Sequence, residues 1–128
     1  MANRSFPSAR IMNYQSDAVL ITGSFVANGA ITVIHGDGFA VAYTGAGDYL
    51  VTLTDQFRHC IAFGANLGLA TPVADRIINC GIPAVAVGAA ATMQIQTFDT
   101  ATLTASNPAG ATDRITFFML VSNSYLDT

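Results

Sequence analysis

The sequence predicts an all-β protein built as an antiparallel sandwich or barrel. Apolar and polar residues alternate with a period of two in the clearest runs, as they do in strands that bury one face. Turn residues separate the runs at a spacing of about ten residues. The chain of 128 residues also lacks both Lys and Glu, on which helical bundles and coiled coils depend, and its length is that of one domain.

The first five predicted strands are separated by turns, three of which contain glycine. The Asn28-Gly29 pair suits a type I′ hairpin, because both central residues of that turn need a positive φ. The Gly-Asp-Gly at 36–38 and the Gly-Ala-Gly at 45–47 are expected to form further hairpin turns. The five strands are expected at residues 18–26, 30–35, 39–43, 48–54 and 59–67.

The clearest alternation lies in residues 48–54, where Tyr49, Val51 and Leu53 fall on one face. Residues 92–98 alternate as well, with apolar side chains at 93 and 95 opposed by glutamines at 94 and 96. Both runs predict strands that bury one face and expose the other.

Two segments in the second half depart from this pattern. Residues 70–78 predict a short helical turn, because Thr71-Pro72 can begin one and Asp75 would lie in its first turn. Residues 84–91 are small and apolar, which fits either a buried strand or an extended packing segment.

The last predicted strand, residues 114–123, is apolar on both faces. Residues 115, 117, 119 and 121 share one side, and residues 118 and 120 take the other. Such a strand is central in a sandwich or lies at a subunit interface. We expect one face in the core and part of the other in a contact between protomers, with a fully internal strand as the alternative. The interface candidates are Phe117, Phe118, Met119 and Leu120.

The composition excludes several classes of function. Only 10% of the residues are charged, against about 25% in average proteins, and they comprise five arginines and eight aspartates with a net charge of −3. So few scattered arginines predict neither nucleic-acid binding nor a polybasic membrane anchor. The most apolar stretch, residues 82–93, is too short to span a membrane, and residues 1–10 do not resemble a secretory signal. A surface this poor in charge indicates that partners cover much of it.

No catalytic, metal or cofactor site is predicted. His35 and Asp37 lack a third ligand at a readable spacing. His59 and Cys60 are neighbours in a predicted strand, so their side chains point to opposite faces. Cys60 and Cys80 are expected to be thiols in a reducing compartment, with a disulfide between them as the alternative.

Two stretches carry a resemblance to a known family. Residues 38–57 combine a G-F-x-V strand, a T-G-x-G turn, Y-x-V-T-L and D-x-F, and residues 107–124 contain D-R-I-T-F and L-V-S-N-S. These stretches resemble the small capsid decoration, or cement, proteins of tailed bacteriophages, and related hairpins occur in phage tail-fibre and spike domains. The resemblance implies an antiparallel β-sandwich or jelly-roll-like protomer, usually trimeric, seated where capsomers meet. It implies no catalytic residue.

The expected function is therefore that of a structural virion protein without enzymatic activity or cofactor. It would be made in the cytoplasm of the host bacterium and would bind the capsid surface as a homotrimer, with the major capsid protein as partner and no contact with nucleic acid or membrane. Residues 1–17 are expected to form an arm ahead of one domain at 18–128, or else a terminus lying on the surface. The candidates for capsid contact in this segment are Arg4, Phe6, Arg10 and Tyr14.

Two alternatives belong to other classes of function. One is a receptor-binding domain of a tail fibre, which would expose aromatic side chains. The other is a small β-barrel enzyme or ligand binder, which would need polar groups converging on a pocket.

Overall fold

The computed structural model describes residues 18–27, 31–71, 76–108 and 112–122. These residues form nine strands and no helix, which confirms the predicted all-β class. The strands are β1 (Ala18–Val26), β2 (Thr32–His35), β3 (Phe39–Gly45), β4 (Asp48–Gln56), β5 (His59–Gly68), β6 (Arg76–Cys80), β7 (Ala90–Asp99), β8 (Thr104–Ala105) and β9 (Arg114–Ser122).

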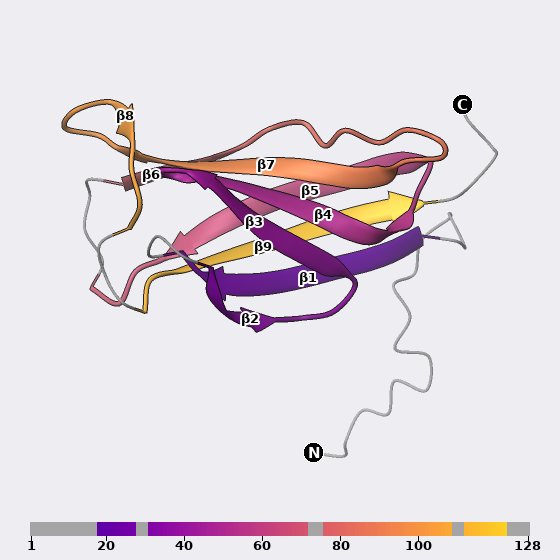
Figure 1. The fold of residues 1–128 in the computed structure, drawn as a ribbon, viewed down its shortest axis with the longest axis horizontal. Coiled ribbons are helices and arrows are strands. Elements are labelled where there is room, and N and C mark those ends of the chain that lie inside the picture. Colours follow the sequence, from indigo (N-terminus) through magenta and orange to yellow (C-terminus); the bar gives the residue numbers. More distant parts are fainter. Residues whose placement is uncertain (1–17, 28–30, 72–75, 109–111, 123–128) are drawn as a thin grey trace, which may run out of the picture.

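The strands are arranged in two antiparallel sheets. One sheet has the order β2-β1-β9-β5, and the other has the order β3-β4-β7-β6, with β8 paired to β7. Figure 1 shows the two layers, with β7 along the top and β1 along the bottom. The arrangement is consistent with a β-sandwich, in which two sheets pack face to face over a shared core.

The core lies between the sheets and draws on both of them. The alternation predicted within β4, β7 and β9 is confirmed, because every second side chain is buried from 49 to 53, from 91 to 97 and from 115 to 121. One cluster joins these side chains to those of β1 and the adjoining loops; its members are Ile21, Phe25, Ala27, Tyr49, Val51, Leu53, Phe57, Ala91, Met93, Ile95, Ile115, Phe117, Met119 and Val121. Packing of apolar side chains from both layers therefore holds the sheets together.

A hydrogen-bonded group centred on Tyr49 ties three distant loops together. The Tyr49 ring is fully buried, and its hydroxyl donates toward the carbonyl of Ala27 at 2.6 Å and lies 2.9 Å from Oδ1 of Asn107. The same Oδ1 accepts the N–H of Gly47 at 2.8 Å, and Nδ2 of Asn107 donates to the hydroxyl of Tyr43. The end of β1, the β3–β4 turn and the segment before β9 are thus fixed relative to one another.

The helical turn predicted for residues 70–78 is wrong where the structure describes it. Arg76, Ile77 and Ile78 belong to β6, which pairs with β7 from Arg76↔Asp99 to Cys80↔Ile95, and residues 72–75 lie outside the described residues. The β-branched isoleucines gain ladder hydrogen bonds and partial burial of Ile78 in this strand. Tertiary pairing therefore outweighs the capping pattern at Thr71-Pro72.

The turn at 36–38 is also not the predicted hairpin. β2 and β3 lie in different sheets, so this segment carries the chain from one layer to the other. The turn at 45–47 does join two paired strands, β3 and β4, as predicted. Asn28-Gly29 lies outside the described residues, although the strands on either side of it pair. In the segment 84–91, Ala84 forms a single bridge with Thr92, and β7 begins at Ala90.

Candidate interaction surface

The outward side of the β2-β1-β9-β5 sheet carries apolar side chains near the end where β1 begins. The register aligns Leu20 of β1 with Leu120 of β9, and Leu120 with Ala62 of β5. The next row aligns Thr22, Phe118 and Gly64. We call these six residues the apolar outer face; Thr22 is its one polar side chain, none of the six is ionisable, and Leu20 and Phe118 are 46% and 40% exposed.

Phe118 owes its position to the glycine beside it. A Cβ atom at Gly64 would lie 2.7 Å from Cε1 of Phe118, which is closer than a real Cβ approaches another atom. The absent side chain lets the ring lie over the backbone of β5. An aromatic ring that covers a neighbouring glycine contributes to pairing between the two strands. The Phe118 ring therefore extends the apolar outer face over the backbone of β5.

The same side of the sheet becomes polar toward the other end of β1. The third row aligns Ser24 with Thr116 and Thr116 with Asn66, and Nη1 of Arg114 lies 3.4 Å from Oγ of Ser24. The apolar outer face therefore has a polar border on this side, as contact sites between proteins do at their rim.

The structure divides the four interface candidates of the last strand into two pairs. Phe117 and Met119 are buried in the core, and the Phe117 ring meets that of Phe39 edge-on at 4.8 Å between centroids. Phe118 lies on the outward side, and Leu120 lies beside it on the same face. Only this second pair faces away from the core in the protomer.

The structure does not describe the four candidates for capsid contact. Arg4, Phe6, Arg10 and Tyr14 all lie outside the described residues, as does the whole of the expected arm at 1–17. The first described residue, Ala18, pairs with Ser122 at the end of β9. The expected arm would therefore join the described chain at the end of the sheet that bears the apolar outer face.

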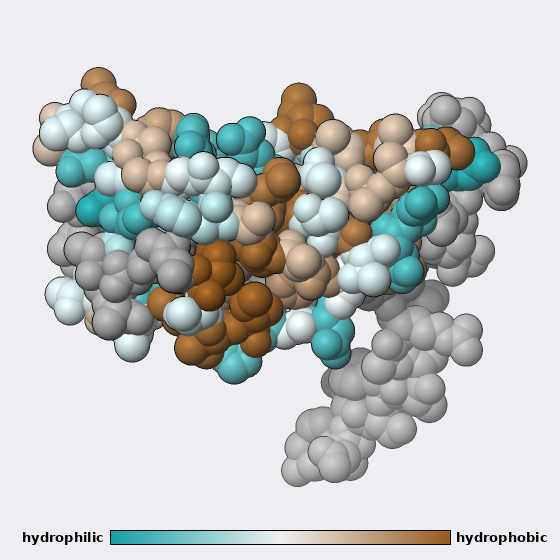
Figure 2. Space-filling view, in the orientation of Figure 1, coloured by the Kyte–Doolittle hydropathy of each residue, from teal (hydrophilic) through white to brown (hydrophobic). Residues whose placement is uncertain are grey.

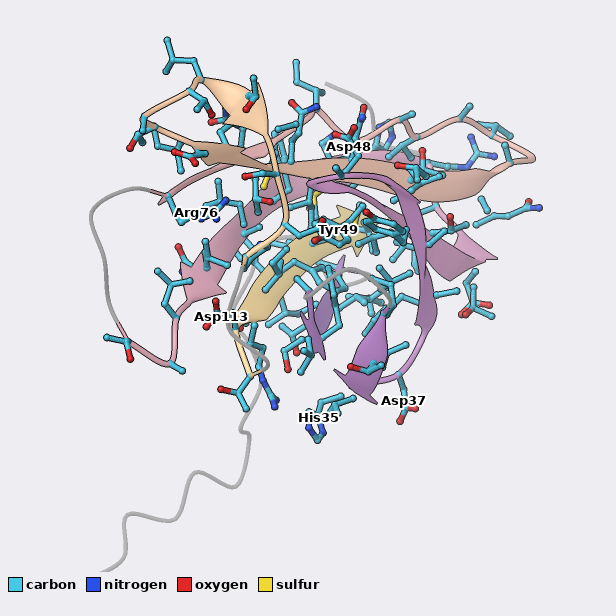
Figure 3. The ribbon with its side chains drawn as sticks, turned by 60° about the vertical axis from the view of Figure 1, so that its left-hand side comes forward. His35, Asp37, Asp48, Tyr49, Arg76 and Asp113 are labelled. Atoms are coloured by element: carbon cyan, nitrogen blue, oxygen red, sulfur yellow. The ribbon has the colours of Figure 1, made fainter. Side chains whose placement is uncertain are left out.

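The labelled ionisable side chains do not converge on one place. Figure 3 shows His35 and Asp37 near one corner of the molecule, well away from Arg76, Asp48 and Asp113. Asp48 instead accepts a hydrogen bond from the amide of Gln96 at 2.5 Å, and Asp113 accepts the N–H of Ala70 at 2.9 Å. These carboxylates bind neighbouring elements of the fold.

Both cysteines are free thiols. Cys60 lies beside Val121 and Cys80 beside Ile95, in different sheets, and burial raises the pKa of each thiol. A raised pKa lowers the fraction of thiolate at neutral pH, so both thiols are weak nucleophiles. Within the described ranges, no group of three or more His, Cys or Asp side chains could hold a metal ion, and no helix is long and apolar enough to cross a membrane.

The sequence alone predicts the β9 part of this surface but not the parts that β1 and β5 contribute. The alternation along residues 114–123 separates Phe118 and Leu120 from the core positions. Nothing in the sequence showed that β1 and β5 flank β9, so Leu20 and Ala62 were not identified. Their position outside the core follows the same period-two pattern, but their meeting with Phe118 depends on the pairing of distant strands.

Comparisons of the chain with family models, with curated proteins and with solved structures found no match.

Proposed function

We propose that this chain is a structural virion protein that binds the exterior of a tailed-phage capsid as a homotrimer and stabilises the head. The observation that carries the proposal is the apolar outer face on a chain with so few charges. Free in solution, this patch would hold apolar area against water, at about 25 cal/mol per Å². Contact with sister protomers removes that cost.

The hairpin that carries the family resemblance supports the proposal. Residues 38–57 contain β3, the turn at 45–47 and β4, which pair from Phe39↔Leu53 to Gly45↔Asp48. Residues 107–124 contain β9, the strand that carries Phe118 and Leu120. Each stretch that resembles decoration proteins thus contains strands that pair within the chain.

Stabilisation of the head would follow from mass action. A protein that binds only the assembled lattice shifts the equilibrium toward assembly. Three copies held together also bind as one event, because the second and third contacts form at high effective concentration. Arginine in place of lysine suits such contacts, since a guanidinium is more weakly hydrated and is enriched at interfaces.

Two measurements test the proposal. Light scattering should give a particle of three 13.3-kDa chains, about 40 kDa, and electron microscopy of the parent particle should locate the chain on the head. A monomer at micromolar concentration would refute the trimer. Location on the tail would refute the decoration role and favour a receptor-binding domain.

The protomer contact itself is tested at Phe118. Phe118→Arg places a charge in the apolar outer face and should dissociate the trimer, because burial of an unpaired charge is strongly unfavourable. Thr116→Arg is the matched control, since it lies on the same face of the same strand within the polar border. A Phe118→Arg protein that stays trimeric would exclude this face from the protomer contact.

The arm is tested by deletion. Removal of residues 1–14 should weaken binding to heads while the unfolding transition of the domain persists, because β1 begins only at Ala18. Binding measured by co-sedimentation with heads, unchanged by the deletion, would exclude Arg4, Phe6, Arg10 and Tyr14 as capsid contacts.

A further inference from the structure

The crossover between β2 and β3 contains the one Asp-Gly pair of the sequence. Asp37 is the only aspartate that is followed by a glycine, and both Asp37 and Gly38 are exposed. Figure 3 shows Asp37 at a corner of the molecule, directed away from the sheets. Figure 2 shows hydrophilic residues at the lower edge of the molecule, along β2 and the segment that leads to β3. Solvent therefore reaches both residues of the pair.

The backbone at Gly38 leaves its nitrogen open to reaction. The carbonyl of Gly38 accepts the N–H of Thr54 at 2.8 Å. Within the described ranges, however, the N–H of Gly38 donates no hydrogen bond and the Asp37 carboxylate accepts none. No atom lies within 4 Å of the Cβ position at Gly38, and glycine itself brings no Cβ to hinder the approach of a side chain to its nitrogen. The Asp37 carboxyl group can therefore reach this nitrogen without a competing contact.

We propose that Asp37 is a site of spontaneous isomerisation to isoaspartate in the folded protein, through a succinimide formed with Gly38. The backbone nitrogen of Gly38 bonds to Cγ of Asp37, a C–O bond of the protonated carboxyl group breaks, and one water molecule leaves. Water then opens the ring: addition at Cγ restores aspartate, and addition at the main-chain carbonyl carbon gives isoaspartate. The reaction transfers no electrons and needs no co-reactant except water. It does not depend on the proposed function.

The other described aspartates are less suited to this reaction. Three of them have carboxylates that accept hydrogen bonds from neighbouring groups, and each of the three is followed by a residue with a Cβ; they are Asp48, Asp99 and Asp113. Asp55 lies within β4 and precedes Gln56, whose side chain crowds the nitrogen that would attack. Exposure, a carboxylate without a hydrogen bond and a following glycine therefore coincide at Asp37 among these residues.

Isomerisation lengthens a connection that is fixed at both ends. Isoaspartate carries the main chain through Cβ and Cγ, which adds one atom to the backbone. On one side Gly36 lies against β1, since a Cβ there would lie 2.6 Å from the carbonyl O of Thr22; on the other side Phe39 pairs with Leu53. β2 is the weaker neighbour, because all four of its residues are exposed and Val33 has a φ of +48°, which a β-branched residue rarely adopts. The added atom should therefore loosen the pairing of β2 with β1 and leave the core intact.

Uptake of heavy oxygen from the solvent measures the reaction. The folded protein is incubated at neutral pH in water enriched in the heavy isotope of oxygen, and fragmentation by mass spectrometry then locates the label. Hydrolysis of the succinimide places a solvent oxygen in residue 37. Asp37→Glu, which would need a larger ring, should lose this uptake, and Gly38→Ala should reduce it several-fold because its Cβ hinders the nitrogen. Asn28-Gly29 is distinguished by its chemistry, since release of ammonia from asparagine changes the mass even in ordinary water.

A synthetic peptide of residues 33–42 provides the unfolded reference. The folded protein should take up label at Asp37 on the same time scale as this peptide, while Asp48 and Asp99 stay unlabelled. No uptake at Asp37 in the time that labels the peptide would overturn the proposal, and so would equal uptake at Asp48 or Asp99. Hydrogen exchange of the aged protein tests the consequence: amides of β2 should exchange faster in the isoaspartate fraction, and those of β9 should not change. Unchanged exchange along β2 would refute the loosening of this strand.

Discussion

The buried hydroxyl of Tyr49 shows how one polar group can order several loops. The Tyr49 ring lies among apolar side chains, with its centroid 5.6 Å from that of Phe25. Its hydroxyl nevertheless reaches the carbonyl of Ala27 and the side-chain amide oxygen of Asn107. The position of Tyr49 on the inward face could be predicted from the alternation in residues 48–54. Its partners could not, because Ala27 and Asn107 lie far away in the sequence and meet it only in the folded protein.

Tyr49→Phe should therefore destabilise the domain although it keeps the ring. The carbonyl of Ala27 would lose a buried donor, which costs about 1–3 kcal/mol in the free energy of unfolding. Tyr43→Phe is the control, because Tyr43 is exposed and contacts the same Asn107 from the outside. Urea titration of both variants measures the difference, and equal stability of the two proteins would contradict the assigned role.

The titration of Tyr49 predicts how stability changes at alkaline pH. Burial, aided by the nearby Tyr43, raises the pKa of Tyr49 from 10.0 to about 12. Below pH 10 the hydroxyl is protonated in both the folded and the unfolded states, so its stabilising effect is complete. Between pH 10 and 12 only the unfolded state loses the proton, so the free energy of unfolding should fall with rising pH. Tyr49→Phe should show a shallower fall over the same interval.

At the scale of elements, the strands could be predicted but their order in the sheets could not. A period of two reports which side chains share a face. Together with the turn residues, the sequence predicts the bounds of β1, and nearly those of β9. It does not report which strands are neighbours, so the pairing of the first strand with the last was not predicted. The crossover at 36–38 was missed for the same reason, since a glycine turn suits a hairpin and a change of sheet equally.

The turn between β3 and β4 requires glycine for two separate reasons. Gly47 has a φ of +74°, and a Cβ there would lie 2.6 Å from the backbone N of Ser106 and from the carbonyl O of Thr97. Gly38 has a similar φ of +87°, but no atom lies within 4 Å of its Cβ position. Gly38→Ala should thus cost only the backbone term of about 1–2 kcal/mol, and Gly47→Ala should cost clearly more. Thermal or chemical unfolding of both proteins gives the comparison, and equal losses would show that the close contact is unimportant.

At the scale of the whole molecule, the scarcity of charge governs how the proposed trimer should respond to salt. The apolar outer face, which is the surface proposed for contact between protomers, carries no ionisable side chain, so it offers no ion pair for salt to screen. The apparent mass should therefore stay near three chains from low salt to about 1 M NaCl, a range in which the Debye length falls to about 3 Å. Dissociation at high salt in sedimentation experiments would instead indicate a contact built from charges.

The pairing of β1 with β9 also governs the order in which the protein can fold. Among the described strands, only β9 bonds to both β1 and β5, and it leaves the ribosome after both of them. Until it arrives, β1 and β5 lack the partner that joins them into one sheet, and their apolar edges stay open to other chains. The β3–β4 hairpin can form earlier, because its two strands are consecutive in the sequence. Nascent chains stopped before Arg114 should therefore remain sensitive to protease, whereas chains released with β9 complete should become resistant.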